Sequence, residues 1–208
     1  MERKIQLKVC GMRDEDNIMQ VAALRPDYMG FIFFPTSPRF VGMDFMIPSS
    51  FPVNIKRVGV FVNEANEVMI ELHHRLKLDF LQLHGHESVA QVRDLQEKGI
   101  KVIKVFSVDD SFDFSTIISY EKHVSFFLFD TKGKYYGGNA MAFNWEKLKE
   151  YNQKVPFFLS GGLNEENVKG IEALKAMNLH ALDVNSGVEI SPALKDIDKL
   201  KAFDKILC

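Results

Sequence analysis

The sequence has 208 residues, of which 46% are hydrophobic and 26% are charged, and its formal net charge is −2. The nearly balanced charge excludes the broad basic surface with which proteins attract nucleic acids or anionic membranes. No apolar run approaches the roughly 20 residues that cross a bilayer, residues 1–9 lack the apolar core of a signal peptide, and Cys10 and Cys208 are too few for a disulfide framework. We therefore expect a soluble cytoplasmic protein.

Short apolar runs alternate with longer amphipathic segments along the chain. Eight runs rich in Val, Ile, Leu and Phe are predicted strands: 5–10, 28–34, 57–62, 80–85, 101–107, 125–131, 156–162 and 181–187. Seven segments with apolar residues at every third or fourth position are predicted helices: 17–24, 66–76, 88–99, 114–123, 145–151, 166–177 and 197–207. The stretch 41–53 is the weakest helix prediction, because Pro48 and Pro52 interrupt it.

The arrangement of these elements indicates the fold class. Nearly continuous apolar strands are typical of a parallel sheet that is buried on both faces by helices. An open flavodoxin-like sheet would account for only about five of the eight strands. We therefore predict an α/β fold, a single (β/α)8 TIM barrel that spans residues 1–208 as one domain.

Polar residues end most of the predicted strands, where barrels of this class build their active sites. Cys10 ends the first strand, and a cysteine can act as a proton-abstracting base if its pKa lies closer to neutrality than usual. A small buried hydrophobe is the alternative role. Asp130 ends the run FFLFD, where a carboxylate is costly to bury unless it is paired or functional. A loop cap that accepts backbone hydrogen bonds is the alternative there.

Two other charged residues are candidate site residues. Arg39 lies in the segment PTSPRF after the second strand, where prolines stiffen the loop and would hold the guanidinium in place. Its planar donors suit a carboxylate, although a solvated surface arginine is the alternative. Asp183, in ALDVNSG, is more consistent with a structural hydrogen-bonding role.

Two glycine-containing loops predict a phosphate site. SGGLNEENV (160–168) and NSGVE (185–189) follow the seventh and eighth strands. Glycines let the backbone approach a ligand closely, and successive N–H groups supply hydrogen-bond donors. Loops after these two strands are the usual phosphate site of such barrels. The position of both loops therefore predicts an anionic, phosphorylated small-molecule ligand.

The histidines do not predict a metal site. His73 and His74 are adjacent on a predicted helix, so their side chains point in different directions. His84 and His86 have no acidic or cysteine partner at a ligand spacing. We interpret His84 as a substrate contact and His86 as a solvated loop residue. Neither a P-loop nor a dinucleotide-binding motif occurs.

Together these motifs resemble the phosphoribosylanthranilate isomerases. KVCG, SPR, QLHG, SGGLN and NSGVE occur in family order, and the similar segments span nearly the whole chain. Other phosphate-binding barrels share the glycine loops but not this combination. The resemblance implies an Amadori rearrangement of tryptophan synthesis, the conversion of N-(5-phosphoribosyl)anthranilate to 1-(2-carboxyphenylamino)-1-deoxyribulose 5-phosphate. It also implies a monomer or homodimer without metal or organic cofactor, since the substrate supplies its own electron sink.

The resemblance implies a role for each matching residue. Cys10 would be the general base, Asp130 the general acid, and Arg39 the residue that holds the anthranilate carboxylate. The remaining residues would contact the substrate, with the first four in the phosphate loops: Gly161, Gly162, Ser186, Gly187, His84 and Asp183.

One segment departs from the family pattern. The loop after the sixth strand usually reads GG-T-G-x-x-F-D-W, whereas this chain reads GGNAMAFNW at 137–145. Ala140 replaces a glycine and does not adopt positive φ as cheaply, so we expect the loop conformation to differ. Asn144 replaces an aspartate and still serves as a helix cap.

Two alternative functions remain at this point. An isomerase of histidine synthesis would keep the phosphate loops but prefer an aspartate at the end of the first strand, where this chain has Cys10. A non-catalytic barrel would keep the phosphate site as a ligand sensor or partner scaffold, and only Ala140 supports it. The set Cys10, Asp130 and Arg39 favours the phosphoribosylanthranilate isomerase over both.

Overall fold

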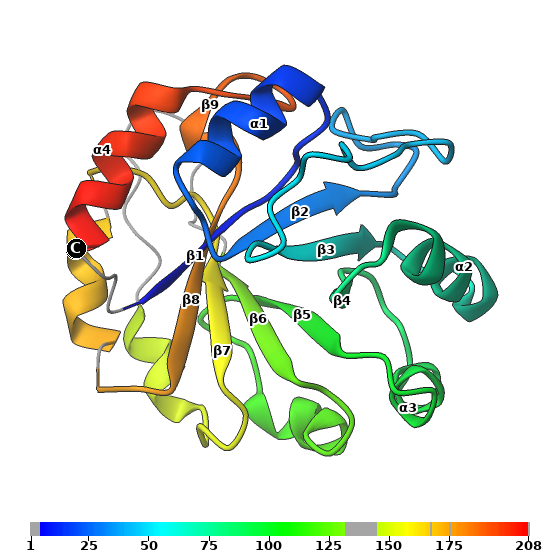
Figure 1. Ribbon diagram of the computed structural model, residues 1–208. Coiled ribbons are helices and arrows are strands. Elements are labelled where there is room, and N and C mark those ends of the chain that lie inside the picture. Colours follow the sequence, from blue (N-terminus) through cyan, green and yellow to red (C-terminus); the bar gives the residue numbers. More distant parts are fainter. Residues whose placement is uncertain (1–4, 132–144, 167, 175, 208) are drawn as a thin grey trace.

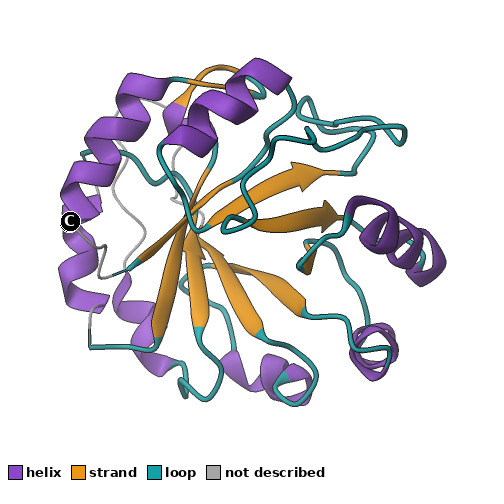
Figure 2. Ribbon diagram, viewed as in Figure 1, coloured by secondary structure: helices purple, strands orange, loops and turns teal. Residues whose placement is uncertain are grey.

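The computed structural model describes residues 5–131, 145–166, 168–174 and 176–207 (Figure 1). Eight parallel strands close into a barrel in chain order, which confirms the predicted TIM barrel. Helices surround these strands (Figure 2). The strands are β1 (Gln6–Val9), β2 (Tyr28–Ile32), β3 (Lys56–Phe61), β4 (Phe80–Leu83), β5 (Val102–Val108), β6 (Phe126–Thr131), β7 (Phe157–Ser160) and β8 (Leu179–Val184).

Four α-helices lie where the amphipathic pattern predicts them. They are α1 (Glu15–Ala23), α2 (Asn66–Leu76), α3 (Val89–Glu97) and α4 (Ile197–Leu207). Ser88 begins α3 with a capping box, in which its hydroxyl accepts from the Gln91 N–H and the Gln91 side chain accepts from the Ser88 N–H. Such caps satisfy backbone donors that have no partner within the helix.

The other predicted helices differ in type. They form 3₁₀ helices, η1 (Phe114–Tyr120), η2 (Trp145–Glu150) and η3 (Val168–Leu174). A short 3₁₀ helix, η4 (Ser186–Val188), and a hairpin of β9 (Glu189–Ser191) and β10 (Leu194–Lys195) follow β8. The sequence pattern did not predict η4 or this hairpin. Among the described residues, no helix is long and apolar enough to span a membrane.

The helix prediction over residues 41–53 was wrong. This described segment consists of turns and loop, and α2 follows β3 directly in the helical layer. Pro48 and Pro52 lack the N–H groups that a helix interior needs. The segment still covers the outer face of β2, because Phe51 is buried and packs edge-on against Phe31 of that strand.

Side chains alternate between the interior of the barrel and the helical layer. One apolar cluster, containing Tyr28, Val58, Ile103 and Val105, fills the interior. A smaller layer of Cys10, Ile32 and Val60 lies at the carboxyl ends of the first three strands. The positions between these layers include polar side chains, Lys8, Gln82 and Asp183, which are almost fully buried. The interior therefore becomes polar toward the carboxyl ends of the strands.

Candidate active site

A pocket of about 190 Å³ opens at the carboxyl ends of the barrel strands. Eight of the nine residues predicted for the site line it, and Arg39 is the exception. The lining residues are Cys10, Ile32, Val60, Gln82, His84, Asp130, Ser160, Gly161, Gly162, Leu163, Asp183, Asn185, Ser186 and Gly187. The ends of seven strands, or the loops that follow them, thus converge on one cavity, as the strand-end pattern predicts.

Cys10 lies just beyond β1, where its N–H donates to the Val184 carbonyl at 2.9 Å. Its thiol faces Gly30 of β2, and a Cβ atom at that glycine would lie 2.7 Å from Sγ, so the close approach requires glycine. Burial raises the pKa of the Cys10 thiol, whereas Lys8 and Lys195 act to lower it. The thiol is therefore shielded from water but has two ammonium groups near it.

A buried ion pair lies beneath the thiol. Lys8 of β1 is in register with Asp183 of β8, and its Nζ donates to Asp183 Oδ2 at 2.7 Å. Burial raises the pKa of the Asp183 carboxyl, although the Lys8 ammonium opposes this. Asp183 Oδ1 has no hydrogen-bond partner among the described residues, and the side chain lines the pocket. This oxygen can accept a hydrogen bond from a hydroxyl group of a bound ligand.

Asp130 lies across the pocket from Cys10, near the end of β6, and its side chain is 26% exposed. His84 Nε2 lies 3.5 Å from Asp130 Oδ2, and Gln82 Nε2 lies 3.3 Å from His84 Nδ1. The three side chains form a row along the wall of the pocket. The carboxyl group of Asp130 can therefore reach a ligand that also contacts the imidazole.

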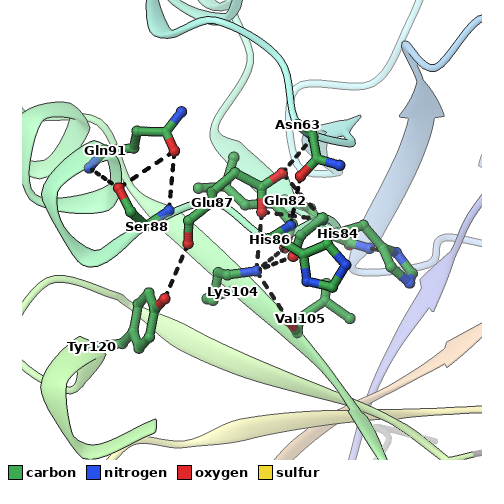
Figure 3. A network of polar contacts seen from close by, with 12 residues as sticks. Asn63, Gln82, His84, His86, Glu87, Ser88, Gln91, Lys104, Val105 and Tyr120 are labelled. Carbon is green, nitrogen blue, oxygen red and sulfur yellow. Dashed lines mark hydrogen bonds and ion pairs between the residues drawn. The ribbon is translucent and has the colours of Figure 1, made fainter. Parts of the chain in front are cut away.

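A network of polar contacts fixes the loop that carries His84 (Figure 3). Glu87 is buried and accepts from the N–H groups of Asn63 and Gly85 at 2.8 and 3.1 Å. Lys104 of β5 donates to Glu87 Oε2 at 3.0 Å and to the carbonyls of Leu83, Gly85 and Val105. These contacts tie the ends of β3, β4 and β5 together, which holds His84 in place.

The predicted phosphate loops lie side by side. Gly161 and Gly162 have φ of 108° and 64°, in the region that favours glycine. A Cβ atom at Gly187 would lie 2.2 Å from the Leu163 carbonyl oxygen, so only glycine allows the second loop to approach the first. The two loops thus form one backbone-lined wall of the pocket.

Arg39 lies beside the pocket and not in its wall. Its Nε donates to Glu189 Oε1 at 2.9 Å, and its Nη2 donates to Glu189 Oε2 at 2.5 Å. Lys195 donates to the same carboxylate at 2.6 Å and to Asn185 Oδ1 at 2.7 Å. A Cβ atom at Gly11 would lie 2.7 Å from Arg39 Cδ, so the arginine stem crosses the loop directly after Cys10. Glu189 thereby fixes the guanidinium near the pocket.

Several residues of the site were missed by sequence reasoning. Lys8 and Gln82 are polar residues at inward positions of apolar strands, and this misfit was the available evidence for them. Asn185 and Glu189 belong to the NSGVE motif, and Lys195 follows it, but none of them was assigned a role from the sequence. In the part of the chain that the structure describes, no group of three or more His, Cys, Asp or Glu residues is arranged to hold a metal. Ala140 and Asn144 lie outside the described residues.

Comparisons with known proteins place this geometry in a family. The sequence model described as N-(5'phosphoribosyl)anthranilate (PRA) isomerase matches residues 7–205. A relative from Parabacteroides distasonis, named N-(5'-phosphoribosyl)anthranilate isomerase, is 44% identical over 95% of this chain and 90% of its own length. A relative of the same name from Phocaeicola vulgatus is 42% identical over 95% of each chain.

Solved structures agree with the sequence comparisons. The phosphoribosyl anthranilate isomerase from Thermotoga maritima superposes with a TM-score of 0.83 at 32% identity and covers 98% of both chains. A phosphoribosyl anthranilate isomerase in complex with reduced 1-(o-carboxyphenylamino)-1-deoxyribulose 5-phosphate superposes with a TM-score of 0.81 at 31% identity over 98% of both chains. The family resemblance of the motifs is thus confirmed, and the chain belongs to the N-(5'-phosphoribosyl)anthranilate isomerase family.

Proposed function

We propose that the chain isomerises N-(5-phosphoribosyl)anthranilate by acid–base catalysis, with Asp130 as the general acid and Cys10 as the general base. The reaction is the Amadori rearrangement of tryptophan biosynthesis, an aldose–ketose conversion and thus an intramolecular oxidoreduction. The observation that carries this proposal is the placement of Cys10 and Asp130 in one pocket with the two glycine loops. The family and the relatives named above support the same activity.

The acid step opens the sugar ring. The Asp130 carboxyl donates its proton to the ring oxygen of the furanose, and the C1–O bond breaks as the aniline nitrogen lone pair forms the C=N bond of a protonated imine. Partial exposure of Asp130 lets its carboxyl exchange protons with water between turnovers. His84, 3.5 Å from Oδ2, holds the carboxyl toward the pocket.

The base step completes the rearrangement. The imine acidifies the proton on C2, and the Cys10 thiolate removes it, so that the C–H electrons form the C=C bond of an enolamine. This species tautomerises to the ketone product. The imine accepts the electrons, so the steps balance without an added oxidant or reductant. The base must be deprotonated, and we expect kcat/KM to rise with pH through the raised pKa of Cys10.

Substrate binding is assigned to other residues that line the pocket and to Arg39 beside it. The loops of Gly161, Gly162, Ser186 and Gly187 offer backbone donors to the phosphate group. Asp183 Oδ1, which lacks a partner among the described residues, accepts a hydrogen bond from a ribose hydroxyl. Arg39 pairs with the anthranilate carboxylate through the guanidinium edge that Glu189 leaves open.

The proposal extends to the localisation, domain organisation, cofactor use and oligomeric state of the protein. We propose a cytoplasmic enzyme with one catalytic domain over residues 1–208 that acts on a small phosphorylated molecule and not on nucleic acid. We propose that it acts without a metal or organic cofactor, as a monomer or homodimer. A related structure shows monomers made from the dimeric phosphoribosylanthranilate isomerase of Thermotoga maritima, and it superposes with a TM-score of 0.79 at 30% identity. The dimeric state of that protein supports the homodimer.

The test is the decay of substrate fluorescence when enzyme is added to fresh phosphoribosylanthranilate in the presence of a chelator. Wild type should consume the substrate, whereas Cys10→Ala and Asp130→Asn should each lose about 10²–10⁴-fold in kcat. Cys208→Ala is the matched cysteine control and should keep wild-type turnover. If the wild-type protein leaves the substrate intact, the proposed isomerase activity is wrong. If Cys10→Ala and Asp130→Asn turn over at wild-type rates, the residue roles are wrong.

A further inference from the structure

Lys8 is a buried cation that the proposed reaction does not yet use. It lies two positions before Cys10 on β1, and residues two apart on a strand point to the same face. Both side chains therefore face the barrel interior, with Lys8 one layer deeper. Most other interior side chains are apolar, such as Val58 and Ile103. A lysine is almost never fully buried unless it is paired, so its presence here indicates a role.

We propose that Lys8 is a positioning residue for the isomerase reaction, whose ammonium keeps Asp183 in place and favours the thiolate form of Cys10. This inference rests on the proposed role of Cys10 as the base. The ion pair between Lys8 Nζ and Asp183 Oδ2 is 2.7 Å long, and the two side chains are 0% and 5% exposed. Both side chains are shielded from bulk water, so the ammonium stabilises a nearby thiolate more strongly than it would in solvent.

The charged groups around Cys10 come from four elements. Lys8 belongs to β1, Asp183 to β8, Lys195 to β10, and Arg39 to the loop after β2. Lys195 and Arg39 share the Glu189 carboxylate, which offsets part of their positive charge. Without Lys8, the Cys10 thiolate and the Asp183 carboxylate, which come from neighbouring strands, would lose the ammonium that interacts with both. Lys8 is therefore the cation that prevents repulsion between the base and its acidic neighbour.

The protonation state of Lys8 fits this role. Burial acts to lower the pKa of the Lys8 ammonium, but attraction to Asp183 and Cys10 outweighs it and raises the pKa overall. Lys8 therefore keeps its proton while Cys10 gains one from the substrate. In the base step, the substrate C2 proton moves to Sγ, and the ammonium charge stays where it is.

The experiment measures the Cys10 thiol directly, by ultraviolet thiolate absorbance against pH in a Cys208→Ala background, so that only Cys10 reports. Lys8→Met should raise the thiol pKa by about one unit or more, which is about tenfold less thiolate at a given pH below the pKa. The alkaline shift should recur in the pH profile of kcat/KM. Lys104→Met is the matched control, because it removes another buried, paired lysine that does not face Cys10. It should leave the thiol pKa unchanged.

The outcomes separate the two proposals. An unchanged thiol pKa in Lys8→Met would overturn the role of Lys8 and leave Cys10 as the base. A thiol pKa that shifts while the kcat/KM profile stays in place would overturn Cys10 as the base, and with it the role of Lys8 in the reaction. If Lys8→Met does not fold, Lys8→Met with Asp183→Asn removes both charges. That double variant should still raise the thiol pKa, because the Lys8 ammonium, on the same face of the chain as Cys10, lowers this pKa more than the Asp183 carboxylate raises it.

Discussion

Among the buried lysine–carboxylate pairs of the described residues, two look alike but lie on opposite sides of the barrel wall. Lys8 and Asp183 meet inside the barrel at 2.7 Å, with exposures of 0% and 5%. Lys104 and Glu87 meet at 3.0 Å, with exposures of 2% and 0%. Lys104 lies between the inward residues Ile103 and Val105, so its side chain points toward the helical layer.

The partners of the two pairs differ. Lys104 donates to three carbonyls as well as to Glu87, and Glu87 accepts from two backbone N–H groups (Figure 3). Asp183 instead keeps one oxygen without a partner among the described residues, next to the pocket. Burial lowers the pKa of Lys104, whereas the pKa of Lys8 is raised by its two acidic neighbours despite burial. The Lys104–Glu87 pair uses its polar atoms in hydrogen bonds that hold loops in place. The Lys8–Asp183 pair keeps one acceptor oxygen available to a ligand.

Losing one partner of either pair should lower the free energy of unfolding more than any other change to these pairs. Lys104→Met leaves Glu87 charged in a dry site, and we expect it to lower the free energy of unfolding by about 5 kcal/mol, the upper end for a broken buried ion pair. Lys8→Met should cost about 3 kcal/mol, because Asp183 borders the pocket and can be hydrated there. Urea unfolding with an unchanged m-value measures both. Equal losses, or a larger loss for Lys8→Met, would contradict the distinction between the pairs.

Removing both charges of a pair separates the cost of an unpaired charge from the cost of the lost hydrogen bonds. Lys8→Met with Asp183→Asn should return to within about 1 kcal/mol of wild type, because neither partner then carries an unpaired charge. Lys104→Met with Glu87→Gln should stay about 3 kcal/mol below wild type, because three carbonyls lose a donor at about 1 kcal/mol each. The same unfolding experiment decides this. Full recovery of the Lys104 double variant would show that those carbonyl contacts contribute little.

The spacing of apolar residues predicted the fold because it differs between buried strands and helices with one buried face. The helix over Asn66–Leu76 has the predicted bounds, since its apolar face and its flanking strands are unambiguous. The segments that begin at Phe114, Trp145 and Val168 show the same spacing of apolar residues, but they form 3₁₀ helices. Apolar spacing of three or four residues fits either helix type, so the pattern does not separate them.

The site was predictable where a residue ends a strand, and less so elsewhere. Cys10, His84 and Asp130 stand directly after apolar runs, and the structure brings them to one pocket. The contact between Arg39 and Glu189 joins residues 150 positions apart, which no local pattern reveals. Lys8 was missed because one lysine in a short strand near the N-terminus has the appearance of a solvated edge residue.

An exposed ion pair on the protein surface should contribute least to the free energy of unfolding. Glu71 accepts from Arg75 Nε at 2.9 Å on α2, one turn apart, and the side chains are 57% and 31% exposed. Glu71→Gln should cost only about 0.3–0.5 kcal/mol in unfolding free energy, because water and salt screen an exposed pair on a helix. Arg75 would keep its contact with the Met43 carbonyl at 2.5 Å, so the loop after β2 should stay in place. High salt should abolish the effect of Glu71→Gln while leaving that of Lys104→Met intact, since only the buried pair is shielded from mobile ions. A loss at Glu71 as large as that at Lys104 would mean that burial is not what separates these pairs.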